Sequence, residues 1–409
     1  MKLIQIKKRI HFSLKTILFA SLVFFIAIEL VVLFAVPVPA SSQKNDLTLH
    51  ELAVKIYTLC KKEEQFHSNC YDREIPKLMD SHSMEQAFAV TKIVQDLDSS
   101  YTYCHVLGHK LSAREVAKDP SKWKEVVTRC PSGVCSNGCI HGGFEEKFRK
   151  QMFTDSDIEK YKPDLAGICE ERDNWHPTGV EQASCYHAVG HLTMYVTNGD
   201  LQKATDLCDM IAITSRGRDF RQLCYDGTFM QIFQPLDADD LSLIEGKQPT
   251  NKTVRALCDQ FTGEKQGSCV SESWPLFRRQ ILTAQGFTAH CMVLKTEQEQ
   301  KRCYNALTYI ILPNLNFDLK KTASFCSGLS ENLQKICYKN AATRLIETDY
   351  RNTSQAVHLC AHAALLLVRE ACFEELAIHA TYYLKKGSSF EEALCNSLPS
   401  KWKKVCMTV

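Results

Sequence analysis

The amino-acid sequence predicts an all-α fold, an α-solenoid of about ten two-helix repeats that are each stapled by a disulfide bond. Cysteines recur with a period near 34 residues, and each period contains two helical patterns. No run of alternating apolar and polar residues bounded by hairpin turns stands out, which argues against a β-sheet. The recurring cysteines are Cys70, Cys104, Cys139, Cys185, Cys224, Cys269, Cys303, Cys337, Cys372 and Cys406, at steps of 34, 35, 46, 39, 45, 34, 34, 35 and 34 residues.

Within a repeat, a short amphipathic helix is expected to precede a longer one, and most repeats have a second cysteine at the end of the short helix. Residues 389–395 show the short pattern and residues 332–346 the longer one. Pairing the two cysteines of a repeat closes a short loop and stabilises the fold by roughly 2.5–3 kcal/mol per disulfide. The upstream cysteines are Cys60, Cys169, Cys208, Cys258, Cys291, Cys326, Cys360 and Cys395.

Four cysteines, Cys104, Cys130, Cys135 and Cys139, fall outside this simple scheme. The array favours pairing Cys130 with Cys139 and Cys104 with Cys135. Connectivity cannot be deduced from sequence alone. A free thiol or a metal-binding thiolate among these four therefore stays open as the alternative.

The period, the helix pairs and the disulfides resemble tetratricopeptide repeats (TPR) and, more closely, the cysteine-rich Sel1-like secreted proteins. The consensus residues of both families are absent, so the resemblance is one of architecture only. It implies a curved array whose concave face is open to a protein or peptide partner.

The N-terminus indicates export of the chain. A basic segment, residues 1–16, precedes an apolar run at residues 17–36, and positive residues stay on the cytoplasmic side of a membrane. Twenty residues suit a transmembrane signal-anchor, although small residues before Ser41 leave a signal peptide ending near residue 40 as the alternative. Both place the body outside the cytoplasm, in the periplasm or at the cell surface, or secreted if the signal is cleaved. The chain's 20 cysteines fit such an oxidising compartment.

The remaining chain divides into three expected segments. Residues 41–233 form histidine-rich helical repeats, residues 234–253 an inserted acidic loop, and residues 254–409 disulfide-stapled repeats without motif chemistry. The net charge is only +2, from 49 basic and 47 acidic residues. Because no basic stripe follows the N-terminus, a nucleic-acid partner is not expected.

The residues that carry chemistry lie between Tyr103 and Met230, where the motif HxxGH occurs twice. Its copies are His105-Val-Leu-Gly108-His109 and His187-Ala-Val-Gly190-His191. Two residues four positions apart share one face of a helix. Each copy therefore presents two imidazoles in the same direction, which suits a metal ion.

Further candidates occur two and six positions after the second cysteine of a repeat. These positions hold His141 and Glu145 in one repeat and Asp226 in another, whereas the later repeats have no histidine there. Neighbouring helices lie about 8–10 Å apart, so side chains of adjacent repeats can converge on one ion.

We therefore expect two metal sites. The first consists of His105, His109, His141 and Glu145 and suits zinc, copper or iron. The second consists of His187, His191 and Asp226, the two-histidine, one-carboxylate composition of open iron sites. One dinuclear centre shared by all of these residues is the alternative for a tightly wound array.

Glycines beside these candidates lower helix stability by roughly 1 kcal/mol each, which indicates that a backbone or a ligand comes close there. They are Gly108, Gly142, Gly143, Gly190 and Gly227.

The leading functional hypothesis is a membrane-anchored extracytoplasmic repeat protein that binds a transition metal ion. One alternative is a metal-dependent enzyme, oxidative or hydrolytic, that uses an open coordination position in the same place. The other is a metal-free interaction scaffold, in which the histidines are hydrogen-bonded core residues. No catalytic residue is assigned, because the sequence contains no nucleophile elbow, phosphate-binding loop or dinucleotide fingerprint.

Overall fold

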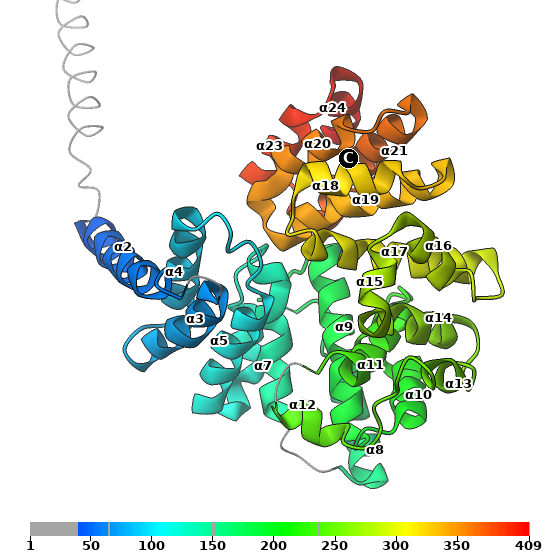
Figure 1. The fold of residues 1–409 in the computed structure, drawn as a ribbon. Coiled ribbons are helices and arrows are strands. Elements are labelled where there is room, and N and C mark those ends of the chain that lie inside the picture. Colours follow the sequence, from blue (N-terminus) through cyan, green and yellow to red (C-terminus); the bar gives the residue numbers. More distant parts are fainter. Residues whose placement is uncertain (1–39, 64–65, 149–152, 173, 236–237, 409) are drawn as a thin grey trace, which may run out of the picture. The chain divides into compact units, whose positions relative to one another are not determined.

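The computed structural model describes residues 40–63, 66–148, 153–172, 174–235 and 238–408. These residues form helices joined by turns and short loops, and they contain no β-strand, which confirms the all-α prediction (Figure 1). The expected cytoplasmic segment at residues 1–16 and the expected membrane segment at residues 17–36 lie outside the described residues. Among the helices that are described, none combines the length and the apolar character that crossing a membrane requires.

The chain divides into two compact units, Met1–Leu52 and Ala53–Val409. Of the first unit, the described part is residues 40–52, which belong to helix α2 (Ala40–Cys60). The second unit contains all the cysteines and both HxxGH motifs. The helical segments before and after the expected acidic loop therefore belong to the same compact unit.

The second unit consists of short and long helices in alternation. Its α-helices are α3 (His67–Glu74), α4 (Met84–Leu97), α5 (His105–Lys118), α6 (Trp123–Thr128), α7 (Gly138–Phe148), α8 (Asp155–Ala166), α9 (Gly179–Val196), α10 (Leu201–Ile211), α11 (Arg221–Phe233), α12 (Ala238–Leu243), α13 (Val254–Cys258), α14 (Gly263–Glu272), α15 (Arg278–Ile281), α16 (Ala284–Cys291), α17 (Glu297–Asn314), α18 (Leu319–Ser327), α19 (Glu331–Thr348), α20 (Thr353–Ala361), α21 (Leu366–Ile378), α22 (Ala380–Tyr383), α23 (Ser389–Ser397) and α24 (Ser400–Cys406). Short 3₁₀ helices are η1 (Ile75–Asp80), η2 (Pro120–Lys122), η3 (Cys135–Asn137), η4 (Trp274–Phe277) and η5 (Tyr350–Asn352).

Several helices begin at side chains that satisfy their free N–H groups. Thr178 accepts a hydrogen bond from the backbone of Glu181 at the start of α9, and Glu181 accepts one from the backbone of Thr178. The same capping box opens α4, α8 and α17. Each such cap stabilises a helix end by about 1 kcal/mol.

The long helices pack against one another in chain order. Helices α5, α7, α9, α11, α14, α17, α19 and α21 each contact the next one in this series (Figure 1). The shorter helices α10, α16, α18 and α20 each contact the longer helix that follows them, and α23 contacts the short final helix α24. This order is the one that stacked helix pairs require, and the repeat solenoid itself stays a prediction.

Ten disulfides hold the helices, and no cysteine is free. All eight expected repeat pairings are present, and so are the two favoured pairings among the remaining four cysteines. A thiolate metal site is therefore not formed. The eight repeat disulfides are Cys60–Cys70, Cys169–Cys185, Cys208–Cys224, Cys258–Cys269, Cys291–Cys303, Cys326–Cys337, Cys360–Cys372 and Cys395–Cys406.

The C-terminal half of the second unit, residues 254–408, packs back onto its N-terminal half, residues 53–233. The backbone N–H of Tyr350 donates to the carbonyl of Gly133 at 3.3 Å, and a Cβ on Gly133 would overlap the Tyr350 ring. Arg351 forms an ion pair with Asp96 at 2.6 Å, across 255 positions of sequence. These contacts close the unit on itself near η3.

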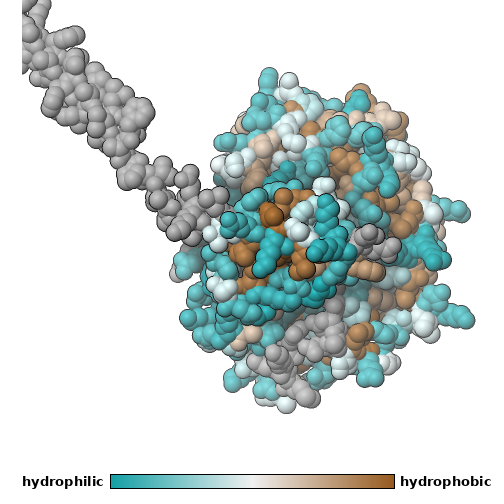
Figure 2. All heavy atoms as spheres, turned by 60° about the vertical axis from the view of Figure 1, so that its left-hand side comes forward, coloured by the Kyte–Doolittle hydropathy of each residue, from teal (hydrophilic) through white to brown (hydrophobic). Residues whose placement is uncertain are grey.

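The expected acidic loop contains structure of its own. Helix α12 lies within it, Ile244 is buried, and the Asp240 carboxylate accepts a hydrogen bond from the Tyr195 hydroxyl. Part of this segment is therefore helical, and its apolar residues pack on α9. For this reason its sequence pattern differs from that of a repeat. The outer surface seen in Figure 2 is mostly hydrophilic, with small hydrophobic areas between the charged side chains.

Candidate metal centre

Glycines bring the helices that carry the histidines into direct backbone contact. A Cβ on Gly142 of α7 would overlap the carbonyl oxygen of His109 on α5. On the next pair of helices, a Cβ on Gly227 of α11 would overlap the carbonyl oxygen of His187 on α9. Gly108 and Gly190 make the matching approaches from α5 and α9. The close backbone approach expected at these glycines is therefore confirmed.

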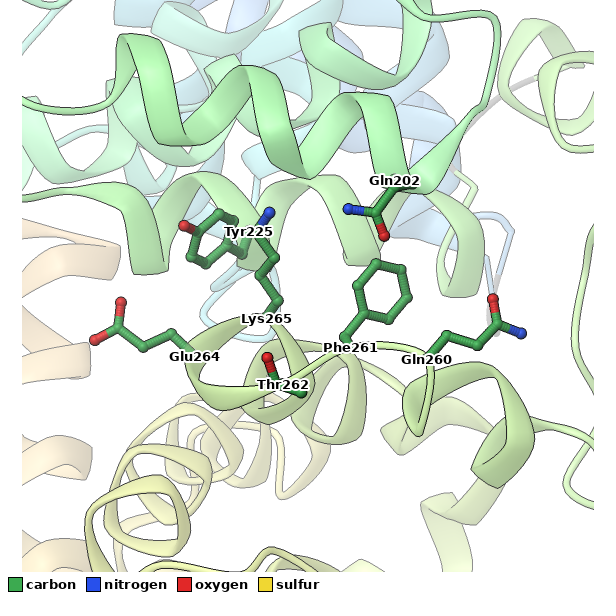
Figure 3. Close-up of a pocket in the computed structure, with 7 residues that line it drawn as sticks. All are labelled: Gln202, Tyr225, Gln260, Phe261, Thr262, Glu264 and Lys265. Carbon is green, nitrogen blue, oxygen red and sulfur yellow. The ribbon is translucent and has the colours of Figure 1, made fainter.

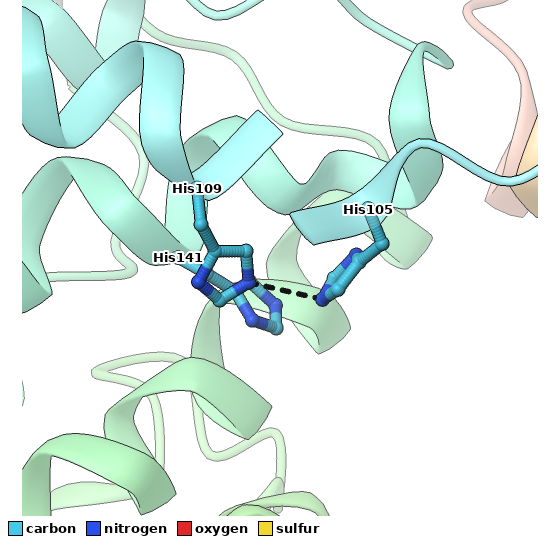
Figure 4. A group of neighbouring side chains, drawn as sticks. All are labelled: His105, His109 and His141. Carbon is cyan, nitrogen blue, oxygen red and sulfur yellow. Dashed lines mark hydrogen bonds between the residues drawn. The ribbon is translucent and has the colours of Figure 1, made fainter. Parts of the chain in front are cut away.

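Three imidazoles converge at the first of these helix contacts. His105 and His109 lie one turn apart on α5, and His141 reaches them from α7 (Figure 4). One nitrogen from each ring can be chosen so that all three lie within 4.8 Å of one another. The Nε2 atoms of His105 and His109 are 3.0 Å apart. Two nitrogens bound to one tetrahedral ion at the usual Zn–N distance lie about 3.3 Å apart, so this spacing approaches that of a metal site.

The other nitrogen of each ring faces a hydrogen-bond acceptor. His105 Nδ1 lies 3.2 Å from the carbonyl oxygen of Ser136, and His109 Nδ1 lies 3.2 Å from Oε2 of Glu145. His141 Nε2 lies 3.0 Å from the Ser184 hydroxyl, and its Nδ1 is buried without a hydrogen-bond partner among the described residues. Histidine ligands usually donate their second ring N–H to a carboxylate, carbonyl or hydroxyl in this way, because that bond orients the ring.

The hydrogen-bond partners at this site leave two neutral imidazoles, His105 and His109, facing each other through lone pairs. A neutral imidazole carries one N–H and one lone pair. The carbonyl of Ser136 and the carboxylate of Glu145 place the hydrogens of His105 and His109 on Nδ1. Both Nε2 atoms then point lone pairs at each other across 3.0 Å. A cation between them, either a proton or a metal ion, removes this repulsion.

Burial opposes protonation of three of the clustered rings. Burial, reinforced by the neighbouring imidazoles, holds the pKa of His105 and of His141 well below the ordinary value of 6.5. Burial followed by repulsion from His191 and Arg344 does the same for the pKa of His187. These rings are therefore unprotonated at neutral pH, which is the state that binds a metal ion.

A left-handed turn presents the Ser136 carbonyl to His105. Cys135, Ser136 and Asn137 have φ angles of 53°, 49° and 58°, a region that residues other than glycine seldom adopt. Backbone held in such a region costs on the order of 1 kcal/mol or more per residue and is found mainly at functional sites. The disulfide Cys104–Cys135 joins this turn to the residue before His105.

The second HxxGH motif lies directly beside the first cluster. His187 Nε2 and His191 Nε2 are 3.3 Å apart, and His191 Nδ1 lies 2.7 Å from Oε1 of Gln231. The ring centre of His141 lies 5.7 Å from that of His187 and 6.0 Å from that of His191. The four motif histidines and His141 therefore form one continuous cluster with His141 at its centre. This proximity matches the alternative of one shared group rather than two separate ones.

Asp226 faces another part of the protein. Its Oδ1 accepts hydrogen bonds from Gln222 at 3.0 Å and from Ser268 of α14 at 2.5 Å. Burial raises the pKa of Asp226 to about 6 and raises that of the neighbouring Glu272 as well. The structure thus turns Asp226 toward α14, while Glu145 lies beside His109. The role of both as direct ligands stays a prediction.

Several groups around the cluster could not be recognised from sequence patterns. Ser136 contributes a backbone atom, and Ser184 and Gln231 are recognisable only through their hydrogen bonds. Arg344 lies more than 150 positions away, in the half without motif chemistry. His176 lies at the surface, where its Nδ1 is 2.6 Å from Oε1 of Glu171.

A separate pocket of about 310 Å³ lies between α10, α11 and α14 (Figure 3). Both of its charged side chains are paired, Lys265 with Asp206 at 2.6 Å and Asp209 at 2.8 Å, and Glu264 with Arg302. The Tyr225 hydroxyl donates to Asp209. These polar groups are engaged with one another, so we assign no ligand to this pocket. It is lined by Gln202, Tyr225, Gln260, Phe261, Thr262, Glu264 and Lys265.

Comparison of the chain with protein-family models, with curated proteins and with solved structures found no match. The function of the protein is therefore inferred from the geometry of the histidine cluster.

Proposed function

We propose that this protein binds a transition metal ion through His105, His109 and His141. The observation that carries the proposal is the pair of Nε2 atoms 3.0 Å apart whose hydrogens are held on the opposite side of each ring. A metal ion accepts both lone pairs, and the buried Nδ1 of His141 supplies the third. Zinc, copper and iron all accept imidazole nitrogen.

We further propose that the second HxxGH motif belongs to the same centre. His187 and His191 contact His141, so they can accept a second ion or complete the coordination of the first. Three histidine ligands leave a position open at a tetrahedral ion, as in catalytic zinc sites. This open position favours a metal-dependent enzyme, oxidative or hydrolytic, as the second candidate function. In the remaining candidate, a metal-free scaffold, the imidazoles only pack.

The ten disulfides point to an oxidising, extracytoplasmic environment. Three further parts of the proposal depend on the sequence pattern. They are anchoring of the protein by residues 17–36, a repeat solenoid architecture, and a protein or peptide partner on its concave face. The basic residues before the apolar run support the orientation with the second unit outside the cytoplasm.

Metal content of the purified full-length protein tests the proposal. We expect about one or two ions per chain by elemental analysis, falling after His109→Gln, because this change removes one of the converging nitrogens. His290→Gln is the matched control, since His290 is a half-buried histidine whose Nε2 lies 2.8 Å from the carbonyl oxygen of Val270. Absence of metal in the wild type after supply of zinc, copper and iron would favour the scaffold.

A further inference from the structure

Arg344 extends from the C-terminal half toward the histidine cluster. It lies on α19, and its Cζ is 6.0 Å from the ring centre of Tyr103. The Tyr103 ring stacks on the His105 ring, with centres 5.8 Å apart and planes 19° apart. On another side, Arg344 Cζ is 5.4 Å from the ring centre of Tyr309. Arg344 thus lies next to the Tyr103 ring that stacks on His105.

The guanidinium of Arg344 is only partly used by the protein. Its Nη1 lies 3.6 Å from Oε2 of Glu347, which is a loose ion pair. Its Nε is buried and has no hydrogen-bond partner among the described residues. Buried donors without a partner are rare and indicate a missing water, ion or ligand.

The charges around the cluster also leave a place for an anion. A divalent ion together with Arg344 would carry three positive charges, whereas the carboxylates of Glu145 and Glu347 supply two negative ones. An anionic ligand would balance the remainder and separate the ion from the guanidinium.

We propose that Arg344 recognises a ligand carboxylate that also occupies the open position on the metal ion. The inference rests on the proposed metal centre and names the chemical class of its ligand. The Nε edge of a guanidinium matches a carboxylate through two parallel hydrogen bonds, which an ammonium group cannot reproduce. The carboxylate then accepts both hydrogen bonds from Arg344, and one of its oxygens also coordinates the ion through its second lone pair.

Cobalt(II) provides a direct test, because its visible absorption reports a change of ligand. The full-length protein is loaded with cobalt and titrated with acetate, and we expect a saturable spectral change. Arg344→Met should weaken acetate binding about tenfold or more. Lys339→Met is the matched control on the same helix, where Lys339 pairs with Glu375 at 2.6 Å.

Arg344→Lys separates recognition from folding, since it keeps the charge and loses the Nε edge. We expect it to weaken acetate binding while retaining cobalt. Equal acetate affinity in wild type and both Arg344 variants would overturn the inference and leave Arg344 as the structural partner of Glu347. Tighter binding of inorganic phosphate than of acetate would overturn the carboxylate assignment. Failure of the wild type to bind cobalt would overturn the metal centre itself.

Discussion

At the scale of single residues, hydrogen bonds on the outer side of each imidazole decide what its inner side can do. Ser136 and Glu145 hold the hydrogens of His105 and His109 away from each other. Burial lowers the pKa of His105, so a proton on this ring is disfavoured at neutral pH. A cation that accepts the two facing lone pairs would therefore be bound favourably. This expectation depends on the positions of the imidazole hydrogens, which no sequence motif encodes.

The low pKa of His141 predicts how the metal-free protein responds to acid. In the unfolded chain a histidine titrates near 6.5, whereas burial holds the pKa of His141 well below this value in the folded state. As pH falls below about 6.5, the unfolded chain binds the proton first, so the free energy of unfolding falls. It rises again as pH increases.

His141→Gln should reduce this slope by up to about 1.4 kcal/mol per pH unit, which corresponds to one proton. Urea unfolding of chelator-treated protein at several pH values between 5 and 7.5 provides the measurement. An unchanged slope in His141→Gln would show that His141 titrates alike in the folded and unfolded states.

At the scale of helices, small residues and disulfides set the distance between the elements that carry the ligands. The α5–α7 and α9–α11 contacts are so close that a Cβ on the glycine at each contact would overlap a carbonyl oxygen of the facing helix. Close approach is what lets imidazoles from neighbouring helices reach one ion. The turn at Ser136 adds an acceptor that a regular helix end would not provide at this position.

Two glycine-to-alanine changes separate this packing role from helix propensity. Gly142→Ala would place a methyl group against the carbonyl of His109, whereas Gly267 of α14 has open space at the same position. We expect Gly142→Ala to lower the free energy of unfolding by about 1–3 kcal/mol and to weaken metal binding, because α5 and α7 must move apart.

Gly267→Ala should be neutral or stabilise the protein by up to about 1 kcal/mol, because alanine favours a helix. Thermal unfolding and a chelator competition assay on both variants supply the comparison. Unimpaired metal binding in Gly142→Ala would mean that the ligands tolerate a wider helix spacing.

At the scale of the whole second unit, contacts between its two halves position residues next to the proposed metal centre. Tyr350 of the C-terminal half packs on Gly133, two residues before the Cys135 turn, and Arg344 reaches Tyr103. Residues that bind no metal can therefore influence the site through the position of η3. The C-terminal half thus contributes a packing contact at Gly133 and a charged group next to Tyr103.

Tyr350→Ala tests this support. Loss of the buried ring should lower the free energy of unfolding by about 3–5 kcal/mol and also weaken metal binding, because η3 loses its packing partner. Phe287→Ala is the matched control: Phe287 is fully buried and its ring contacts are with Tyr304 and Phe325 of the same half. If both variants keep the wild-type metal affinity, the closure of the halves has no part in the centre.

The sequence by itself determined the local features of this protein. The helical class, the disulfide within each helix pair and the two imidazoles on one face of α5 or α9 all follow from spacings of a few residues. The need for close approach at Gly142 and Gly227 was readable for the same reason, since glycine is costly inside a helix.

Only the tertiary structure decided which of these residues meet. Whether His141 or Asp226 joins the histidines depends on how each helix is rotated about its axis, and this rotation is set by packing against helices distant in sequence. The same packing directs Asp226 to Ser268 and brings Arg344 toward Tyr103. Side-chain periodicity defines a face of a helix, but the neighbour that covers this face is chosen by the burial of apolar surface over the whole unit.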